Sequence, residues 1–421
     1  MNKVTNRTQD ELLLSKIINP NPQGNRISDL MDNIIIWDKK YVIPDGYHPL
    51  TFEIIRDHEG RIQWIFPTNN LFPVHTTMAK GITKEVPKSK KYLSRLLFSS
   101  GLRSIGSSET VTILFQRKPM LMQEIANIPH HSYGILFNYQ SGMEKALVVL
   151  THRNVPSYVI KIPFTTLGHK YHEREKANLE ALKHVRLTKS ILPVSIPTKQ
   201  AGVYAYKVYH TPTAKQARLL TGLHLECLME LYKLPTASSG IFSYVQEMEE
   251  QLSEIAPEYD HSLILIKELF AQFKGNSFLP VGWGNGQFIP GVLEVLPDQI
   301  NMNNWERSSS DLPLFFDWFQ FNYHASSAGS LSAIADEVIS SYPQILEKWT
   351  EEIPLHTLHA CFALHFMLNE IDGILIKDPV NGKKNYALSD VTSWLKKLSA
   401  NAGQEQVEFE YSHHKNLSYH L

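Results

Sequence analysis

The first half of the chain contains a series of short apolar runs separated by turn-like segments. Three of these runs, YGILFNYQ, KALVVLTHR and SYVIKIP, lie between Ser132 and Pro163, and only SGME and NVP separate them. Such short connections join antiparallel strands, because a parallel pair needs a crossover of a dozen or more residues. The pattern therefore predicts an antiparallel meander. Shorter runs at residues 33–38, 47–67 and 111–116 predict further strands before it.

A helical pattern follows the meander. Lys170 to Val185 reads KYHEREKANLEALKHV, with apolar residues three and four positions apart among mixed charges, which predicts a helix. Gly202 to Tyr209 predicts one more strand, and the sequence after Ala214 is helical in character except for an irregular interval from Phe278 to Trp318. This order predicts an α+β protein in which one helix is inserted in an antiparallel sheet and a helical lobe follows. It is not the strand–helix alternation that builds a doubly wound sheet.

Length and composition divide the chain into four parts. Its 421 residues correspond to two or three domains at about 100–200 residues each. We expect a flexible arm over residues 1–30, which are polar and contain NPNPQGN, and a small α+β domain over residues 31–127. Residues 128–212 are expected to form the sheet with its single helix, and residues 213–421 the helical lobe.

Charge and cysteine content exclude several classes of protein. Lys and Arg number 41 against 42 Asp and Glu, a formal net charge of −1, which argues against a chain-wide polycation that binds nucleic acid. Cys227 and Cys361 are far apart and form no metal-binding or redox spacing, so we expect no disulfide framework and a reducing compartment. No apolar run reaches the roughly 20 residues that span a bilayer, and the N-terminal residues lack a secretory apolar core. We therefore expect a cytoplasmic protein without a membrane span.

Lys161 lies in the middle of the strand predicted for Tyr158 to Pro163. Taken alone, such a lysine is most often an edge-strand residue that points into water. The helix that follows carries Glu173 and Glu175, 12 and 14 residues further on. A lysine on a strand and a glutamate on the next helix form the ion pair that orients nucleotide phosphates in kinases. Lys161 is therefore a candidate phosphate-binding residue.

Residues 132–400 resemble the aminoglycoside phosphotransferase-like branch of the protein-kinase fold. The likeness rests on the meander, the VIK strand, a helix in which Arg174-Glu175 is followed by leucines four and seven residues on, two more strands and a helical lobe. The resemblance implies a bilobal kinase-like fold and favours Glu175 over Glu173 as the partner of Lys161. It also implies ATP as a candidate cofactor, bound through Lys161 and Glu175.

The catalytic segment of that family contains a His-Gly-Asp, then a Pro and an Asn, and this sequence departs from it. The corresponding stretch is VGWGNGQFIPGVLEV. Gly286 and Pro290 match the family, but Asn285 stands at the position of the His, Gln287 at that of the catalytic Asp and Val292 at that of the Asn.

A second family motif, Asp-Trp-Glu, corresponds to Asn304, Trp305 and Glu306. Asn304 therefore replaces the aspartate that binds Mg²⁺ in the family. Further along the chain, Asp317 in FFDWFQF keeps the aspartate of an aromatic family motif and is a candidate catalytic residue. A simpler interpretation is a buried junction into a helix, in which the Asp317 side chain caps backbone amides.

The side chains at these positions predict impaired phosphotransfer. Gln287 is neutral and accepts no proton at pH 7, so an amide replaces the usual base. Asn304 offers Mg²⁺ one neutral carbonyl oxygen and Val292 offers none, so metal binding at these two positions is in question. If the loop is threaded differently, Asp298 and Asp311 are alternative carboxylates near it in sequence.

Three functional hypotheses follow from the sequence. The first is a catalytically impaired pseudokinase that keeps a nucleotide site and acts as a regulatory or interaction module for an unidentified protein partner; the resemblance hints at a bacterial, glycan-related pathway. The second is an active ATP-dependent phosphotransferase that acts on a sugar or amino-sugar hydroxyl. The third is a kinase-like fold with different transfer chemistry. Whether the chain is an enzyme stays open, and thermal shifts with ATP, with and without Mg²⁺, would separate the three.

Overall fold

A computed structural model divides the chain into two compact units. The first comprises Met1–Arg186 and Ile191–Lys215, and the second comprises Leu187–Ser190 and Gln216–Leu421. The structure describes residues 34–37, 42–56, 60–68, 109–115, 120–139, 144–152, 155–209, 215–217, 219–235, 281–290, 292–313, 315–325, 331–340, 362, 393–394 and 396–397. The arm predicted for residues 1–30 lies outside these ranges. Within them, no helix is both long enough and apolar enough to cross a bilayer.

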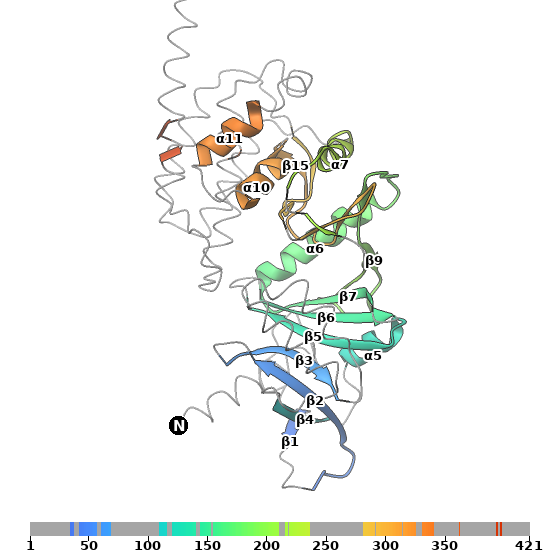
Figure 1. The fold of residues 1–421 in the computed structure, drawn as a ribbon. Helices are drawn as coiled ribbons and strands as arrows, with labels where there is room; N and C mark the ends of the chain where they lie inside the picture. Colours follow the sequence, from blue (N-terminus) through green and yellow to red (C-terminus); the bar gives the residue numbers. More distant parts are fainter. Residues whose placement is uncertain are drawn as a thin grey trace, which may run out of the picture. The chain divides into compact units, whose positions relative to one another are not determined.

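The first unit is built on one nine-stranded sheet with the order β1-β4-β2-β3-β5-β6-β7-β10-β9 (Figure 1). Every neighbouring pair in it is antiparallel. The strands are β1 (Ile34–Trp37), β2 (His48–Arg56), β3 (Ile62–Pro67), β4 (Glu109–Phe115), β5 (Ser132–Asn138), β6 (Lys145–His152), β7 (Val155–Pro163), β9 (Val194–Ile196) and β10 (Tyr204–Lys207). Strands β5, β6 and β7 form the predicted meander, with Ile135 opposite Val148 and Val148 opposite Ile160.

This sheet runs across the boundary that the sequence placed between residues 127 and 128. β3 pairs with β5 through Trp64 opposite Leu136 and Ile65 opposite Ile135, so strands from both sides of that position share one sheet. Their apolar side chains also share one core. Alternate side chains of a strand point to the same face of the sheet, so apolar residues from neighbouring strands meet on that face. Core members from both sides include Phe52, Ile54, Ile113, Ile135, Val148 and Ile160. The division between compact units falls near residue 215, close to the predicted boundary at 212 and 213.

The helices described in the first unit are α5 (Met120–Asn127) and α6 (Thr166–Leu182). Thr165 caps α6, because its side-chain oxygen accepts the amide N–H of Gly168 at 3.0 Å. The buried face of α6 has a spacing of four and three residues, which is the period of a helix with one side in a core. That face consists of Gly168, His172, Glu175, Leu179 and Leu182. The predicted order of meander, helix and further antiparallel strands is confirmed.

The second unit contains two small sheets, one with the order β11-β13-β14-β8 and one that pairs β12 with β15. The strands are β8 (Ser190–Ile191), β11 (Lys215–Gln216), β12 (Val281–Gly284), β13 (Leu293–Val295), β14 (Ile300–Met302) and β15 (Ser309–Pro313). The helices described in this unit are α7 (Gly222–Tyr232), α10 (Phe316–Ala325) and α11 (Leu331–Ser340).

The interval from Phe278 to Trp318, which the sequence analysis expected to be irregular, contains four short strands. Strands β12 to β15 are each only three to five residues long, and turns and irregular segments connect them. Runs this short carry too few residues for an alternating pattern to be visible in the sequence. Within the helical lobe the sequence also predicts helices over residues 331–349, 355–371 and 391–398. Helix α11 covers the first ten residues of the first. Beyond residue 340, the structure describes only residues 362, 393–394 and 396–397 of these three segments.

Candidate functional site

A buried lysine–glutamate ion pair lies in the first unit. Lys161 on β7 places its Nζ 2.8 Å from each carboxylate oxygen of Glu175 on α6. Lys161 is 6% exposed and Glu175 is 1% exposed. Each buried charge needs a partner of opposite sign, because an unpaired charge in a protein interior is strongly destabilising. The structure brings together the two residues that the sequence singled out, and their role in holding nucleotide phosphates stays a prediction.

Helical periodicity explains why Glu175 and not Glu173 meets the lysine. Glu175 falls on the buried face of α6, three residues after His172 and four before Leu179, whereas Glu173 is exposed. Two residues of shift rotate a side chain by about 200° around a helix, so the two carboxylates point to opposite sides.

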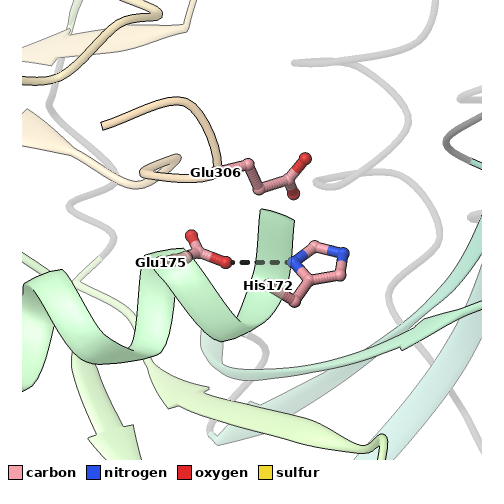
Figure 2. A group of neighbouring side chains, drawn as sticks. All are labelled: His172, Glu175 and Glu306. Atoms are coloured by element: carbon pink, nitrogen blue, oxygen red, sulfur yellow. Dashed lines mark hydrogen bonds and ion pairs between the residues drawn. The ribbon is translucent and has the colours of Figure 1, made fainter. Parts of the chain in front are cut away.

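His172 is a functional candidate that the sequence analysis missed. Its Nδ1 lies 3.2 Å from Oε2 of Glu175, so the same carboxylate meets both the lysine and the imidazole (Figure 2). The imidazole is fully buried, and its ring centroid lies 5.4 Å from that of Tyr204 on β10. Because residues three apart on a helix are neighbours, the sequence HERE, residues 172–175, already placed a histidine beside Glu175.

The catalytic-loop positions lie in the second unit, and two of them meet. The side-chain amide of Asn304 donates a hydrogen bond to the side-chain carbonyl of Gln287. Asn285 Nδ2 donates to the backbone oxygen of Asn304 at 2.6 Å, and Asn285 Oδ1 accepts the backbone N–H of Gln287 at 3.1 Å. The loop after β12 and the segment after β14 are therefore joined by neutral amide groups.

Asp317 fixes this loop from the first turn of α10. Its Oδ2 accepts the backbone N–H of Asn285 at 2.7 Å and its Oδ1 accepts that of Gly286 at 2.9 Å. Asp317 is 1% exposed, and this burial raises its pKa to about 6, an effect that the two amide hydrogen bonds oppose. The side chain thus binds backbone amides in a buried junction, as the simpler interpretation expected, and these amides belong to the loop after β12. Its catalytic role stays a prediction.

Gly286 allows this loop to pass close to its neighbour. Its φ is +68°, in the left-handed region, and a Cβ added there would lie 2.0 Å from the carbonyl oxygen of Arg307. A residue with a side chain would therefore meet both an unfavourable backbone angle and a backbone clash. Position 286 therefore requires glycine for a direct steric reason.

A second contact that holds this loop could not be predicted from the sequence. Phe315, just before α10, has a φ of +64°, which is uncommon for a residue with a side chain. Its backbone N–H donates to the hydroxyl of Tyr232 at 3.0 Å, and the Tyr232 ring packs against the Phe315 ring. Tyr232 thereby holds the turn that places Asp317.

The structure also shows where the other candidate metal-binding positions from the sequence analysis lie. Val292 directly precedes β13, its backbone N–H donates to the oxygen of Ile289 at 3.2 Å, and its side chain has no ligand atom. Asp298 is exposed, and Asp311 accepts a hydrogen bond from the hydroxyl of Ser309. Neutral carbonyl oxygens of Gln287 and Asn304 are weaker Mg²⁺ ligands than carboxylates.

No protein-family model matches the chain, and no curated sequence is similar to it. Solved structures with some likeness include an ADP-bound aminoglycoside phosphotransferase, with 12% identity over 66% of this chain and 97% of that one and a TM-score of 0.40. An amicoumacin kinase in complex with AMP-PNP and Ca²⁺ has 12% identity over 67% of this chain and 93% of that one, with a TM-score of 0.39. A choline/ethanolamine kinase family protein from Mesorhizobium loti has 12% identity, covers 64% and 87%, and has a TM-score of 0.33. Such TM-scores carry no argument by themselves, so the fold rests on the strand pairing and element order above.

Proposed function

We propose that the chain is a kinase-like pseudokinase that binds a nucleotide through Lys161 and Glu175 and transfers phosphate poorly. The observation that carries this proposal is the hydrogen bond between the Asn304 and Gln287 side chains. These are the positions where the resembling family keeps a Mg²⁺-binding aspartate and a catalytic aspartate. We further propose that such a protein acts in the cytoplasm as a regulatory or interaction module.

A pair of amides and a pair of carboxylates at these two positions differ in their need for a cation. Two carboxylates in contact repel each other and need a cation between them, so they form a site that Mg²⁺ stabilises. Two amides satisfy each other, because one donates and the other accepts, and no metal is required. Gln287 also cannot act as a base toward a substrate hydroxyl at pH 7.

Nucleotide binding without bound metal is expected to be weak. The metal ions that neutralise ATP phosphates in kinases have no carboxylate at Gln287 or Asn304, so roughly four negative charges would face Lys161, which Glu175 already pairs. We expect a Kd for ATP on the order of 0.1 mM or weaker, with little dependence on Mg²⁺. Lys161→Met is expected to abolish this binding, whereas Lys207→Met, which removes an exposed lysine of the same sheet, is expected to leave it unchanged.

The double variant Gln287→Asp with Asn304→Asp tests the proposal directly. It places two carboxylates in contact, so we expect a lower melting temperature without metal, a recovery with Mg²⁺ alone, and tighter binding of Mg²⁺–ATP than in the wild type. Gln287→Asn, which keeps a neutral amide, is the matched control and is expected to show no recovery with Mg²⁺. Thermal shift measurements and calorimetry read out both effects.

One result would replace the proposal by its main alternative. If the wild type binds Mg²⁺–ATP at low micromolar affinity, other residues hold the metal and the assignment of Gln287 and Asn304 is wrong. The chain would then be treated as an active phosphotransferase, to be assayed on sugar and amino-sugar hydroxyls. If neither ATP nor Mg²⁺–ATP shifts the melting temperature, a pure interaction module is favoured.

A further inference from the structure

Three side chains of the first unit meet at the buried ion pair, and a fourth packs against them. Lys161 binds both oxygens of Glu175, and Glu175 Oε2 meets His172 Nδ1. The His172 ring packs against Tyr204, whose Cα lies opposite that of Lys161 in the register of β10 and β7. This cluster therefore links α6 to two neighbouring strands.

The carboxylate of Glu175 can only accept hydrogen bonds, so Nδ1 of His172 must carry the hydrogen that points at it. Lys161 alone would fix the distance between Nζ and the carboxylate, but a flexible ammonium on a four-carbon stem does not fix the orientation of the partner. A second donor from the preceding turn of α6 restricts the Glu175 side chain to the rotamer in which both oxygens face Nζ. Hydrogen bonds to ionised groups in a buried setting are among the stronger ones in proteins.

We propose that His172 is a positioning residue, which orients Glu175 and thereby holds the ammonium of Lys161 ready to meet an anionic ligand. The ion pair is in this view preformed by the protein and does not depend on a ligand for its assembly. The part of the proposal that concerns nucleotide binding rests on the proposed function, whereas the part that concerns the state of Lys161 does not.

Two substitutions separate the hydrogen bond of His172 from its packing. His172→Ala removes the donor and the ring, whereas His172→Asn removes the ring but keeps an N–H donor close to the position of Nδ1. If His172 acts through its hydrogen bond, Asn rescues what Ala loses. If the imidazole only fills space between α6 and Tyr204, the two variants are equally affected.

The first measurement follows the reactivity of the Lys161 amine in the protein without nucleotide. Acetylation by acetic anhydride is followed by mass spectrometry, with exposed Lys207 on β10 as the internal reference. We expect His172→Ala to raise the relative rate at Lys161 about tenfold, the order expected when a hydrogen bond to a charged group is lost, and His172→Asn to stay within about twofold of the wild type. In a Glu175→Gln background, His172→Ala is expected to add nothing further.

The second measurement repeats the variants with ATP in a calorimeter. His172→Ala is expected to weaken ATP binding about tenfold and His172→Asn to restore it. A rate at Lys161 that is the same in His172→Ala and the wild type overturns the inference, and so does an Asn variant that behaves like Ala. If the wild type binds no ATP while the labelling rates follow the expected pattern, the proposed function fails and the positioning role of His172 stands.

Discussion

Gly286→Ala tests the close approach of the loop after β12 to the backbone of Arg307. The added Cβ would lie 2.0 Å from the carbonyl oxygen of Arg307 and 2.6 Å from its carbonyl carbon, and φ at this residue is +68°. The left-handed angle costs an L-residue roughly 1–2 kcal/mol, and displacing a packed backbone segment adds roughly 1–3 kcal/mol. We therefore expect the variant to lose about 3 kcal/mol of unfolding free energy, measured by urea titration followed by near-UV circular dichroism.

Two other glycines serve as matched controls for this prediction. Gly60 has a φ of +80° but no atom within 4 Å of its added Cβ, so Gly60→Ala is expected to show the backbone cost alone, about 1 kcal/mol. Gly222, at the start of α7, has neither a positive φ nor a neighbour within that distance, so Gly222→Ala is expected to be neutral or slightly stabilising. A loss in Gly286→Ala no larger than that in Gly60→Ala would refute the close approach to Arg307.

Two further predictions concern the groups that hold the same loop. Burial raises the pKa of Asp317 from 3.8 to about 6, so the protonated carboxyl stabilises the fold most strongly below pH 3.8, and this stabilisation is lost as the pH rises through 6. Relative to Asp317→Asn, the wild type should lose roughly 2 kcal/mol of unfolding free energy between pH 4 and pH 7, and parallel pH profiles of the two proteins would contradict this. Tyr232→Phe removes the hydroxyl that accepts the Phe315 N–H and leaves a buried amide unpaired, so we expect a loss of about 1–3 kcal/mol in urea titrations. An unchanged midpoint in Tyr232→Phe would show that another group satisfies that amide.

Local periodicity explains why the sheet and helix around the ion pair could be predicted from the sequence. Strands β5 to β7 are joined by short turns, and the register of such a meander follows from the chain itself. On α6, Glu175 shares the buried face with Leu179. The sequence analysis kept both Glu173 and Glu175 as candidates and preferred Glu175 because of the family resemblance. The pair with Lys161 followed from one strand and one helix that are adjacent along the chain.

Contacts between segments far apart in the sequence could not be predicted from local periodicity. The pairing of Trp64 with Leu136 joins residues far apart in sequence, and nothing in the apolar pattern of β3 shows that its partner is β5 and not a separate domain. The bond from Tyr232 to Phe315 spans 83 positions and depends on a left-handed backbone angle at a phenylalanine, for which the residue type gives no indication. Short strands such as β13 could not be predicted for a different reason, because three residues are too few to show an alternating pattern.

In the second unit, the residues that hold the loop after β12 in place differ from those expected to bind a metal ion or a substrate. Asp317 binds backbone amides of Asn285 and Gly286, so its hold on the loop does not depend on which side chain stands at position 287. Buried Trp305 likewise holds its own turn, because its indole N–H donates to the oxygen of Met302 at 3.0 Å. Because these backbone groups hold the loop, we expect its shape to persist when an amide at position 287 or 304 is exchanged for a carboxylate. Gln287→Asp also shortens the side chain by one carbon, and Gln287→Asn shortens it equally. The difference between the two proteins in their response to Mg²⁺ therefore measures the effect of charge.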